Sequence, residues 1–243
     1  MPFVTVWRSI GEEEDFVHLA EAAPEQAGAP GQLDVFRDLL VAYARGQRVE
    51  TVTVVGNAPL PPSAQRAELI DDSDLVLRMT TFALDEPGAE PAYGRKTDVV
   101  VLHRGVLVSP HTFADYKSRL YLLAEPGRLH WETEIIPDWW PDDMGFVPIP
   151  NRLFVQPLGR LLGLDPEQAI WATTGTLVVY LAVRLFPAAK IRITGFSILD
   201  RPEQTTFAHA WGEDVNVTGD HRLHAESALL RSWSDTGEIE LIA

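Results

Sequence analysis

Cysteine is absent from this chain of 243 residues. Its absence excludes disulfides and any metal site with cysteine ligands, and a reducing compartment is the default for such a protein. The sequence also lacks an apolar run of eighteen residues, so no transmembrane helix is expected. The segment from Met1 to Trp7 has no basic region followed by a long apolar core and does not read as a secretory signal. We therefore expect a cytoplasmic protein with no membrane span.

Positive charge is scarce. The 20 Lys and Arg residues face 35 Asp and Glu residues, which gives a formal net charge of −15. Such a field repels nucleic acid and anionic membranes, so we expect neither as a partner. An anionic small substrate would need a local group of cations and backbone N–H donors to overcome the overall field.

Hydrophobic residues make up 46% of the chain, enough for one compact domain of this length. Residues 1–32 carry an acidic run and an Ala/Pro/Gly/Glu-rich stretch and are predicted to be an arm or loop region, with a single domain over 33–243. Strands are predicted at 51–55, 74–79, 97–103, 190–196 and 238–242. Helices are predicted at 33–45, 112–124, 173–186 and 220–236, with Gly46 and Gly237 closing the first and last of them.

Strands that alternate with helices predict an α/β fold with a doubly wound, mostly parallel, Rossmann-like sheet. The run Thr51–Val55 lacks polar alternation beyond threonine, as is typical of a strand buried on both faces. In such folds, ligands bind beyond the carboxyl ends of the strands. The loops after Val55, Met79, His103 and Phe196 are therefore the expected site.

Four local patterns have two interpretations each. Gly56-Asn57 is either a plain turn or a turn that offers an amide to a phosphate or ribose. Arg78, at the end of a predicted strand, either pairs with an anion or forms a surface salt bridge. Lys96, beside a glycine, either holds phosphate or is a solvated loop charge. The Thr173-Thr174-Gly175-Thr176 segment opens a helix and either binds an anion or is an ordinary N-cap.

Two histidines and a carboxylate follow near the C-terminus. His221 and His224 are spaced i, i+3 on a predicted helix, and Glu226 is close by. This arrangement has three interpretations: a metal site, a polar surface helix, or a general base supplied by histidine. The metal interpretation is weakened by the absence of HExxH spacing.

The order of these patterns resembles that of the eukaryotic-type sialyltransferase family, glycosyltransferase family 29. The series is VVGN, DLVLRM, GRKT, TTG opening a helix, TGF, and then a histidine five residues before a glutamate. The family's long sialylmotif is similar to residues 52–97 and its short sialylmotif to 172–196. Its third motif is matched by His209-Ala210-Trp211, and its very short motif by the segment from His221 to Glu226.

The resemblance implies a glycosyltransferase-A variant fold and an inverting transfer from a CMP-sugar co-substrate without a metal or other cofactor. Asn57 would contact the nucleotide phosphate or ribose, and the Thr173-Thr174-Gly175 turn would hold the phosphate and the sugar carboxylate. His209 would support the leaving phosphate, His221 would act as general base, and Glu226 would orient its segment. The donor-binding set implied in this way is Gly56, Asn57, Arg78, Thr80, Lys96, Thr173, Thr174 and Gly175.

The chain also departs from the family pattern. The family's disulfide between the two large motifs has its equivalents at Val52 and Phe186, where apolar packing would substitute. The asparagine that follows Arg-Met in the family is Thr80 here, which alters one donor contact. These departures agree with a cysteine-free, soluble, bacterial-like member of the family.

The leading hypothesis is the transfer of sialic acid or a related acidic sugar, such as Kdo, to a glycan or small hydroxyl acceptor. The alternatives are a catalytically silent nucleotide-binding module and a metal-dependent hydrolase that uses His221, His224 and Glu226. Residues 137–151, which are rich in Pro, Trp and Asp, are interpreted as a long loop near the site. Trp139, Trp140 and Trp211 either stack on acceptor sugar rings or pack against the core.

Overall fold

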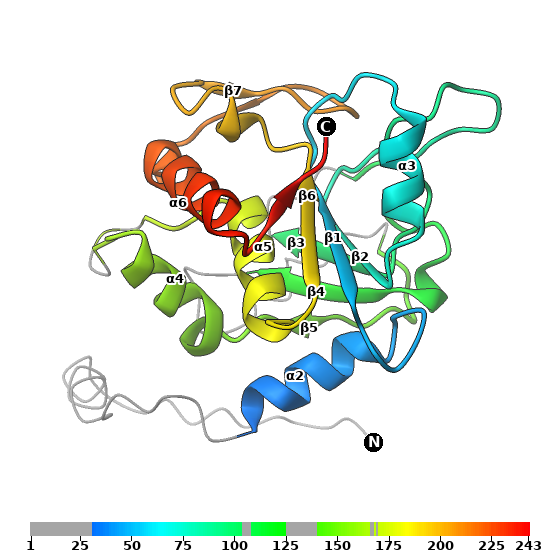
Figure 1. Cartoon of the computed structure of the whole chain (residues 1–243), viewed down its shortest axis with the longest axis horizontal. Coiled ribbons are helices and arrows are strands. Elements are labelled where there is room, and N and C mark those ends of the chain that lie inside the picture. The colour runs from blue at the N-terminus through cyan, green and yellow to red at the C-terminus, as the bar shows by residue number, and fades with distance from the viewer. Residues whose placement is uncertain (1–30, 104–107, 125–139, 166–167, 169) are drawn as a thin grey trace, which may run out of the picture.

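A seven-stranded parallel sheet forms the centre of the computed structural model (Figure 1). The structure describes all residues except 1–30, 104–107, 125–139, 166–167 and 169. The strand order is β5-β4-β3-β2-β1-β6-β9, and all six neighbouring pairs are parallel. The strands are β1 Thr51–Val55, β2 Leu75–Met79, β3 Val99–His103, β4 Leu120–Ala124, β5 Val147–Pro148, β6 Lys190–Thr194 and β9 Glu240–Leu241. The predicted α/β fold with a doubly wound parallel sheet is confirmed.

The direction in which strands are added reverses next to β1. From β1 the chain builds outward through β2, β3, β4 and β5, and then returns to add β6 and β9 on the other side of β1. Val55, the last residue of β1, pairs with Thr194, the last residue of β6. Both strands therefore end at the same edge of the sheet, and this edge is the topological switch point at which open α/β sheets bind ligands.

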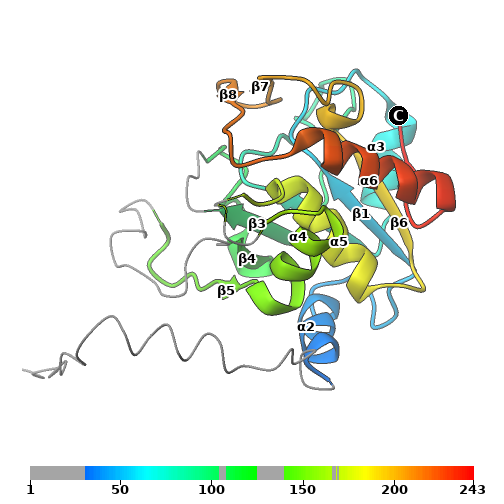
Figure 2. The same ribbon diagram turned by 90° about the vertical axis from the view of Figure 1, so that its left-hand side faces the viewer.

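Helices cover both faces of the sheet. α2 (Gln32–Val41), α4 (Gln156–Leu161), α5 (Thr174–Leu185) and α6 (Leu223–Thr236) lie on one face, and α3 (Ala64–Asp71) lies on the other (Figures 1 and 2). α5 packs across β1, β2, β3 and β6 and buries eight of its twelve residues. None of the helices that the structure describes has the length and apolar character needed to cross a bilayer.

Alternating side chains of the strands divide the core into two layers. Val52 and Val54 of β1 join the large cluster beneath α5, whereas Val55 packs with Ile70 of α3 on the opposite face. This alternation is the two-residue period of a strand. Val52 and Phe186, the two positions at which apolar packing was expected, are both buried in the large cluster.

Two local predictions differ from the structure. Residues 112–124 do not form a helix: a short 3₁₀ turn (Tyr116–Ser118) leads into β4, whose five residues are all buried. The first helix ends at Val41 rather than near Gly46, which does not have a positive φ. Gly237 does close α6, with φ +86°. The sequence patterns missed α3, α4 and the antiparallel hairpin of β7 (Thr206–Phe207) and β8 (Val215–Asn216).

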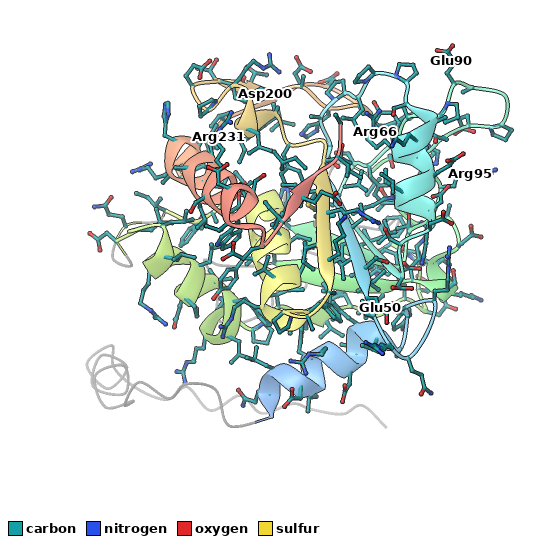
Figure 3. The ribbon with its side chains drawn as sticks, in the orientation of Figure 1. Glu50, Arg66, Glu90, Arg95, Asp200 and Arg231 are labelled. Atoms are coloured by element: carbon teal, nitrogen blue, oxygen red, sulfur yellow. The ribbon has the colours of Figure 1, made fainter. Side chains whose placement is uncertain are left out.

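The β7–β8 hairpin lies beyond the edge at which β1 and β6 end, and α6 starts near that edge and runs back along one face of the sheet (Figures 1 and 2). Arg231 of α6 donates a hydrogen bond to the carbonyl of Leu199, next to Asp200 in the segment that follows β6 (Figure 3). The backbone N–H of Ala210, in the hairpin loop, donates to the carbonyl of Asn57 at 2.7 Å. These contacts fix the C-terminal elements over the carboxyl edge of the sheet.

Two glycines allow β1 and β6 to stay in contact past their last paired residues. A Cβ on Gly56 would lie 2.1 Å from the carbonyl oxygen of Gly195, and a Cβ on Gly195 would lie 2.8 Å from that of Gly56. Gly195 also has φ +75°, a conformation that L side chains rarely adopt. Only glycine fits at both positions without displacing backbone.

We expect Gly56→Ala to lower the free energy of unfolding by about 2–3 kcal/mol, because the new methyl group meets backbone that cannot rotate away. Urea unfolding followed by circular dichroism would measure the change. Gly46→Ala is the matched control, since a Cβ there meets nothing within 4 Å. Equal stability of the two variants would contradict the close approach of β1 and β6.

Candidate functional site

A cavity of about 820 Å³ lies at the carboxyl edge of the sheet. It spans the ends of β6, β1, β2, β3 and β4 and is closed from the other side by the β7–β8 hairpin, the start of α5 and the segment before α6. Its size is within the range of small-molecule sites. Among its lining residues are Gly56, Asn57, Thr80, Thr81, His103, Ala124, Trp171, Thr173, Thr174, Gly175, Gly195, Phe196, Ser197, His209, Asn216, Asp220 and His221.

Asn57 follows β1 and turns its amide toward the end of β2. Its Nδ2 donates to Thr80 Oγ1 at 3.1 Å, while its Oδ1 is buried without a partner among the described residues. Thr80 has φ +41°, which is unusual for a β-branched residue. An unpartnered buried oxygen is costly, and a hydrogen-bond donor on a ligand would satisfy it.

The N-terminus of α5 supplies backbone donors. Thr173 is the N-cap, and its hydroxyl accepts from the N–H of Thr176 at 3.3 Å. The N–H groups of Thr174 and Gly175, both lining the cavity, have no partner in the part of the chain that the structure describes. Free N–H groups and the positive end of the helix dipole favour an anion at this position.

Glu226 fixes the start of α5 from the side that faces away from the cavity lining. It is fully buried on α6, and its Oε2 accepts from Thr173 N at 2.9 Å and from Thr173 Oγ1 at 2.6 Å. It is not among the residues that line the cavity. Glu226 is therefore placed as a positioning residue that fixes the start of α5 relative to α6.

His221 lines the cavity just before α6 and is tied to the segment that precedes α5. Its Nδ1 lies 3.0 Å from the carbonyl oxygen of Trp171, and Trp171 N donates to the carbonyl of Asp220 at 2.9 Å. A carbonyl can only accept, so Nδ1 carries the hydrogen and Nε2 of the neutral ring has the lone pair. This tautomer suits a general base at Nε2.

His209 reaches the cavity from the hairpin. Its Nδ1 lies 3.4 Å from Thr81 Oγ1, next to the Thr80 turn. Burial lowers the pKa of His209, and the charge of Asp214 raises it in part. The ring is therefore biased toward its neutral form, and an anion close to it would favour the charged form.

His103, the last residue of β3, is a cavity residue that the sequence patterns did not single out. Burial lowers the pKa of its imidazole, and His221 and His209 lower it further. It ends a strand that was predicted as 97–103, at the edge where ligands bind. That position was the signal that could have identified it.

Arg78 does not lie where the expected role in donor binding requires. It is fully buried within β2 and donates to the carbonyls of Lys96, Tyr93 and Ala83 at 3.0, 2.7 and 3.4 Å. Burial lowers the pKa of its guanidinium to about 9. It does not line the cavity and instead ties together the loops on the α3 face.

Lys96 is also outside the cavity. It precedes β3 and therefore lies at the amino edge of the sheet, the edge opposite to the cavity. Its Nζ donates to the carbonyls of Ser73 and Asp74 and lies 3.4 Å from Asp98 Oδ2. The predicted donor-binding role of both cations is not supported by their positions.

Of the three tryptophans proposed as acceptor platforms, the two that the structure describes, Trp140 and Trp211, do not line the cavity. Trp139 lies outside the described residues. Trp140 packs edge-on against Phe113 and Phe146 in a second core cluster and donates to the carbonyl of Met144. Trp211 is 41% exposed and contacts the ring of His111.

The three residues of the metal hypothesis do not converge. His221 faces the cavity, His224 is exposed on α6, and Glu226 is engaged with Thr173. Across the described residues, no three or more His, Cys, Asp or Glu side chains are grouped so as to hold a metal ion. A hydrolytic metal centre built from this triplet therefore has no geometric support.

Comparisons with known proteins give a similarity of fold. No protein-family model and no curated protein sequence matches the chain. A crystal structure of a mammalian sialyltransferase matches with a TM-score of 0.52 and 17% identity, over 96% of this chain and 86% of that one. A mammalian sialyltransferase in complex with Gal-β-1-3GalNAc-ortho-nitrophenol has a TM-score of 0.48 and 15% identity, over 96% and 87% of the two chains. The first similarity shows that this chain shares the fold of that protein.

We expect Glu226→Met to reduce the free energy of unfolding by about 2 kcal/mol, because it leaves the partly buried N–H of Thr173 without its acceptor. Glu226→Gln should cost less, since its amide oxygen can accept the same two hydrogen bonds. Chemical denaturation of both variants would measure the difference. If the two substitutions were equally damaging, the hydrogen bonds to Thr173 would not be what Glu226 contributes.

Proposed function

We propose that this protein is an inverting glycosyltransferase that moves sialic acid or a related acidic sugar, such as Kdo, from a CMP donor to a hydroxyl acceptor without a metal. The observation that carries the proposal is that Asn57, Thr174 and His221, from three separate motifs, line one cavity at the switch point of the sheet. The shared fold with a mammalian sialyltransferase supports it.

In the proposed complex, the nucleotide lies over the ends of β1 and β6. The Oδ1 of Asn57 accepts from a hydroxyl of the ribose or from the amino group of the base. The N–H groups of Thr174 and Gly175 donate to the phosphate or to the carboxylate of the sugar, where the dipole of α5 adds to their effect. Fixed donors of this kind are worth about 3 kcal/mol each when charge develops on the leaving group.

Transfer breaks the bond between the anomeric carbon and a phosphate oxygen and forms a bond from that carbon to the acceptor oxygen. The Nε2 of His221 takes the proton of the acceptor hydroxyl, while Trp171 holds Nδ1. His209, which also lines the cavity, stabilises the negative charge on the departing CMP. Thr81 positions that ring through its hydroxyl.

We expect CMP, in preference to UMP or GDP, to raise the melting temperature of the protein, and the shift to persist in EDTA. Ligand at 100 times its Kd stabilises a protein by about 2.7 kcal/mol, which differential scanning fluorimetry resolves easily. Loss of the shift on chelation would argue for a metal-dependent site. Binding of CMP without donor hydrolysis or transfer would instead indicate a silent nucleotide-binding module.

We expect His221→Ala to lower kcat for transfer by about 10²–10⁴-fold, the usual contribution of a general base. Its Kd for CMP should change little, since the proposed nucleotide contacts are made by Asn57 and by the N–H groups of Thr174 and Gly175 rather than by His221. Measuring transfer rate and CMP affinity on the same preparation would separate these effects. His224→Ala, a substitution of an exposed histidine three residues further on, at the start of α6, is the matched control. Normal turnover in His221→Ala would remove this residue from the base role.

A further inference from the structure

The cavity has few groups that can carry positive charge. Of the residues that line it in the described part of the chain, none is Lys or Arg. The ionisable side chains are those of His103, His209, His221 and Asp220. A cavity proposed to hold a nucleotide phosphate and an acidic sugar therefore depends on imidazoles and backbone N–H groups for its positive potential.

The three histidines reach this cavity from separate elements. His103 ends β3, His209 lies in the hairpin region and His221 precedes α6. They are close enough for charge on His221 or His209 to disfavour charge on His103, beyond the effect of its burial. Asp214 acts in the opposite sense on His209, and Asp220 adds a carboxylate to the lining.

Two of the three imidazoles already have a part in the proposed reaction. His221 must be neutral at Nε2 to accept a proton, and His209 faces the leaving phosphate. His103 has no part in that scheme, yet it lies in the same cavity, where charge on either of the other two imidazoles would disfavour charge on its own ring.

We propose that His103 is a further anion-binding residue of this cavity, neutral when the cavity is empty and protonated when an anionic ligand enters. The identity of that ligand rests on the proposed function. In the empty cavity, burial and two neighbouring imidazoles oppose a charge on His103. A phosphate or carboxylate supplies the opposite charge nearby and reverses that balance.

Isothermal titration calorimetry in buffers of different ionisation enthalpy would count the protons taken up on binding. The probe is the methyl phosphodiester of CMP, whose single phosphate charge does not titrate near neutral pH, so any uptake belongs to the protein. Cytidine is the uncharged control. We expect uptake with the diester and none with cytidine. Affinity for the diester should fall as pH rises, with a limit of about tenfold per pH unit for one linked proton.

His103→Asn should reduce the proton uptake and flatten the pH dependence of diester binding, while leaving the affinity for cytidine nearly unchanged. His224→Asn, on the exposed surface of α6, should leave the uptake as in the unmodified protein. His103→Gln provides a second variant if the first does not fold. Histidine-selective ¹⁵N labelling of the unmodified protein gives an independent readout, because the chain has only seven histidines.

The outcomes separate this inference from the function on which it rests. Diester binding with no proton uptake would overturn the role of His103 and leave the glycosyltransferase proposal intact. Uptake that is undiminished in both His103 variants would assign the proton to another group and overturn the inference in the same way. Failure of the diester, of CMP and of cytidine to bind at any pH between about 6 and 8 would overturn the proposed function together with it.

Discussion

The contact between Gly56 and Gly195 is the constraint on which the cavity depends. Strand order reverses between β1 and β6, so the chains that leave these two strands turn away to opposite sides of the sheet. A space therefore opens above their ends. The two glycines hold the ends of β1 and β6 together at the base of that space, because their backbones approach more closely than any side chain would allow. Asn57 and Phe196 follow directly and become walls of the cavity.

The central strands of the sheet could be predicted from the sequence for a physical reason. Strands buried on both faces require continuous apolar, β-branched runs, and Thr51–Val55 is such a run. The segment Leu120–Ala124 shows the limit of this reading. Its five buried residues contain no β-branched side chain, so a short apolar run of this kind fits a helix as well as a strand. Only its pairing with β3, formed by tertiary contact, decides the outcome.

The sequence predicted those site residues whose placement depends on where a strand ends or a helix begins. It misplaced those whose role depends on the direction of the side chain. Asn57, Thr174 and His221 follow strands or open helices, and such positions meet at one edge of a parallel sheet. Lys96 precedes its strand and so belongs to the opposite edge, which the same topology could have indicated. Arg78 lies inside β2, where successive side chains point to opposite faces, and the sequence alone does not fix which face is which. Nor does it reveal the three carbonyls that bind this guanidinium.

Arg78 also explains why a cavity for an anion would be built from neutral donors. A permanently charged guanidinium buried here requires several carbonyl oxygens, and without them its desolvation would be costly. The N–H groups of Thr174 and Gly175 carry no such cost in an empty cavity, since they are neutral dipoles held by the helix. Their positions are set by α5, which Glu226 fixes through Thr173, rather than by a long flexible side chain. An anion bound by these groups would therefore be located as accurately as the helix itself, and the proposed transfer to an acceptor at His221 would require that accuracy.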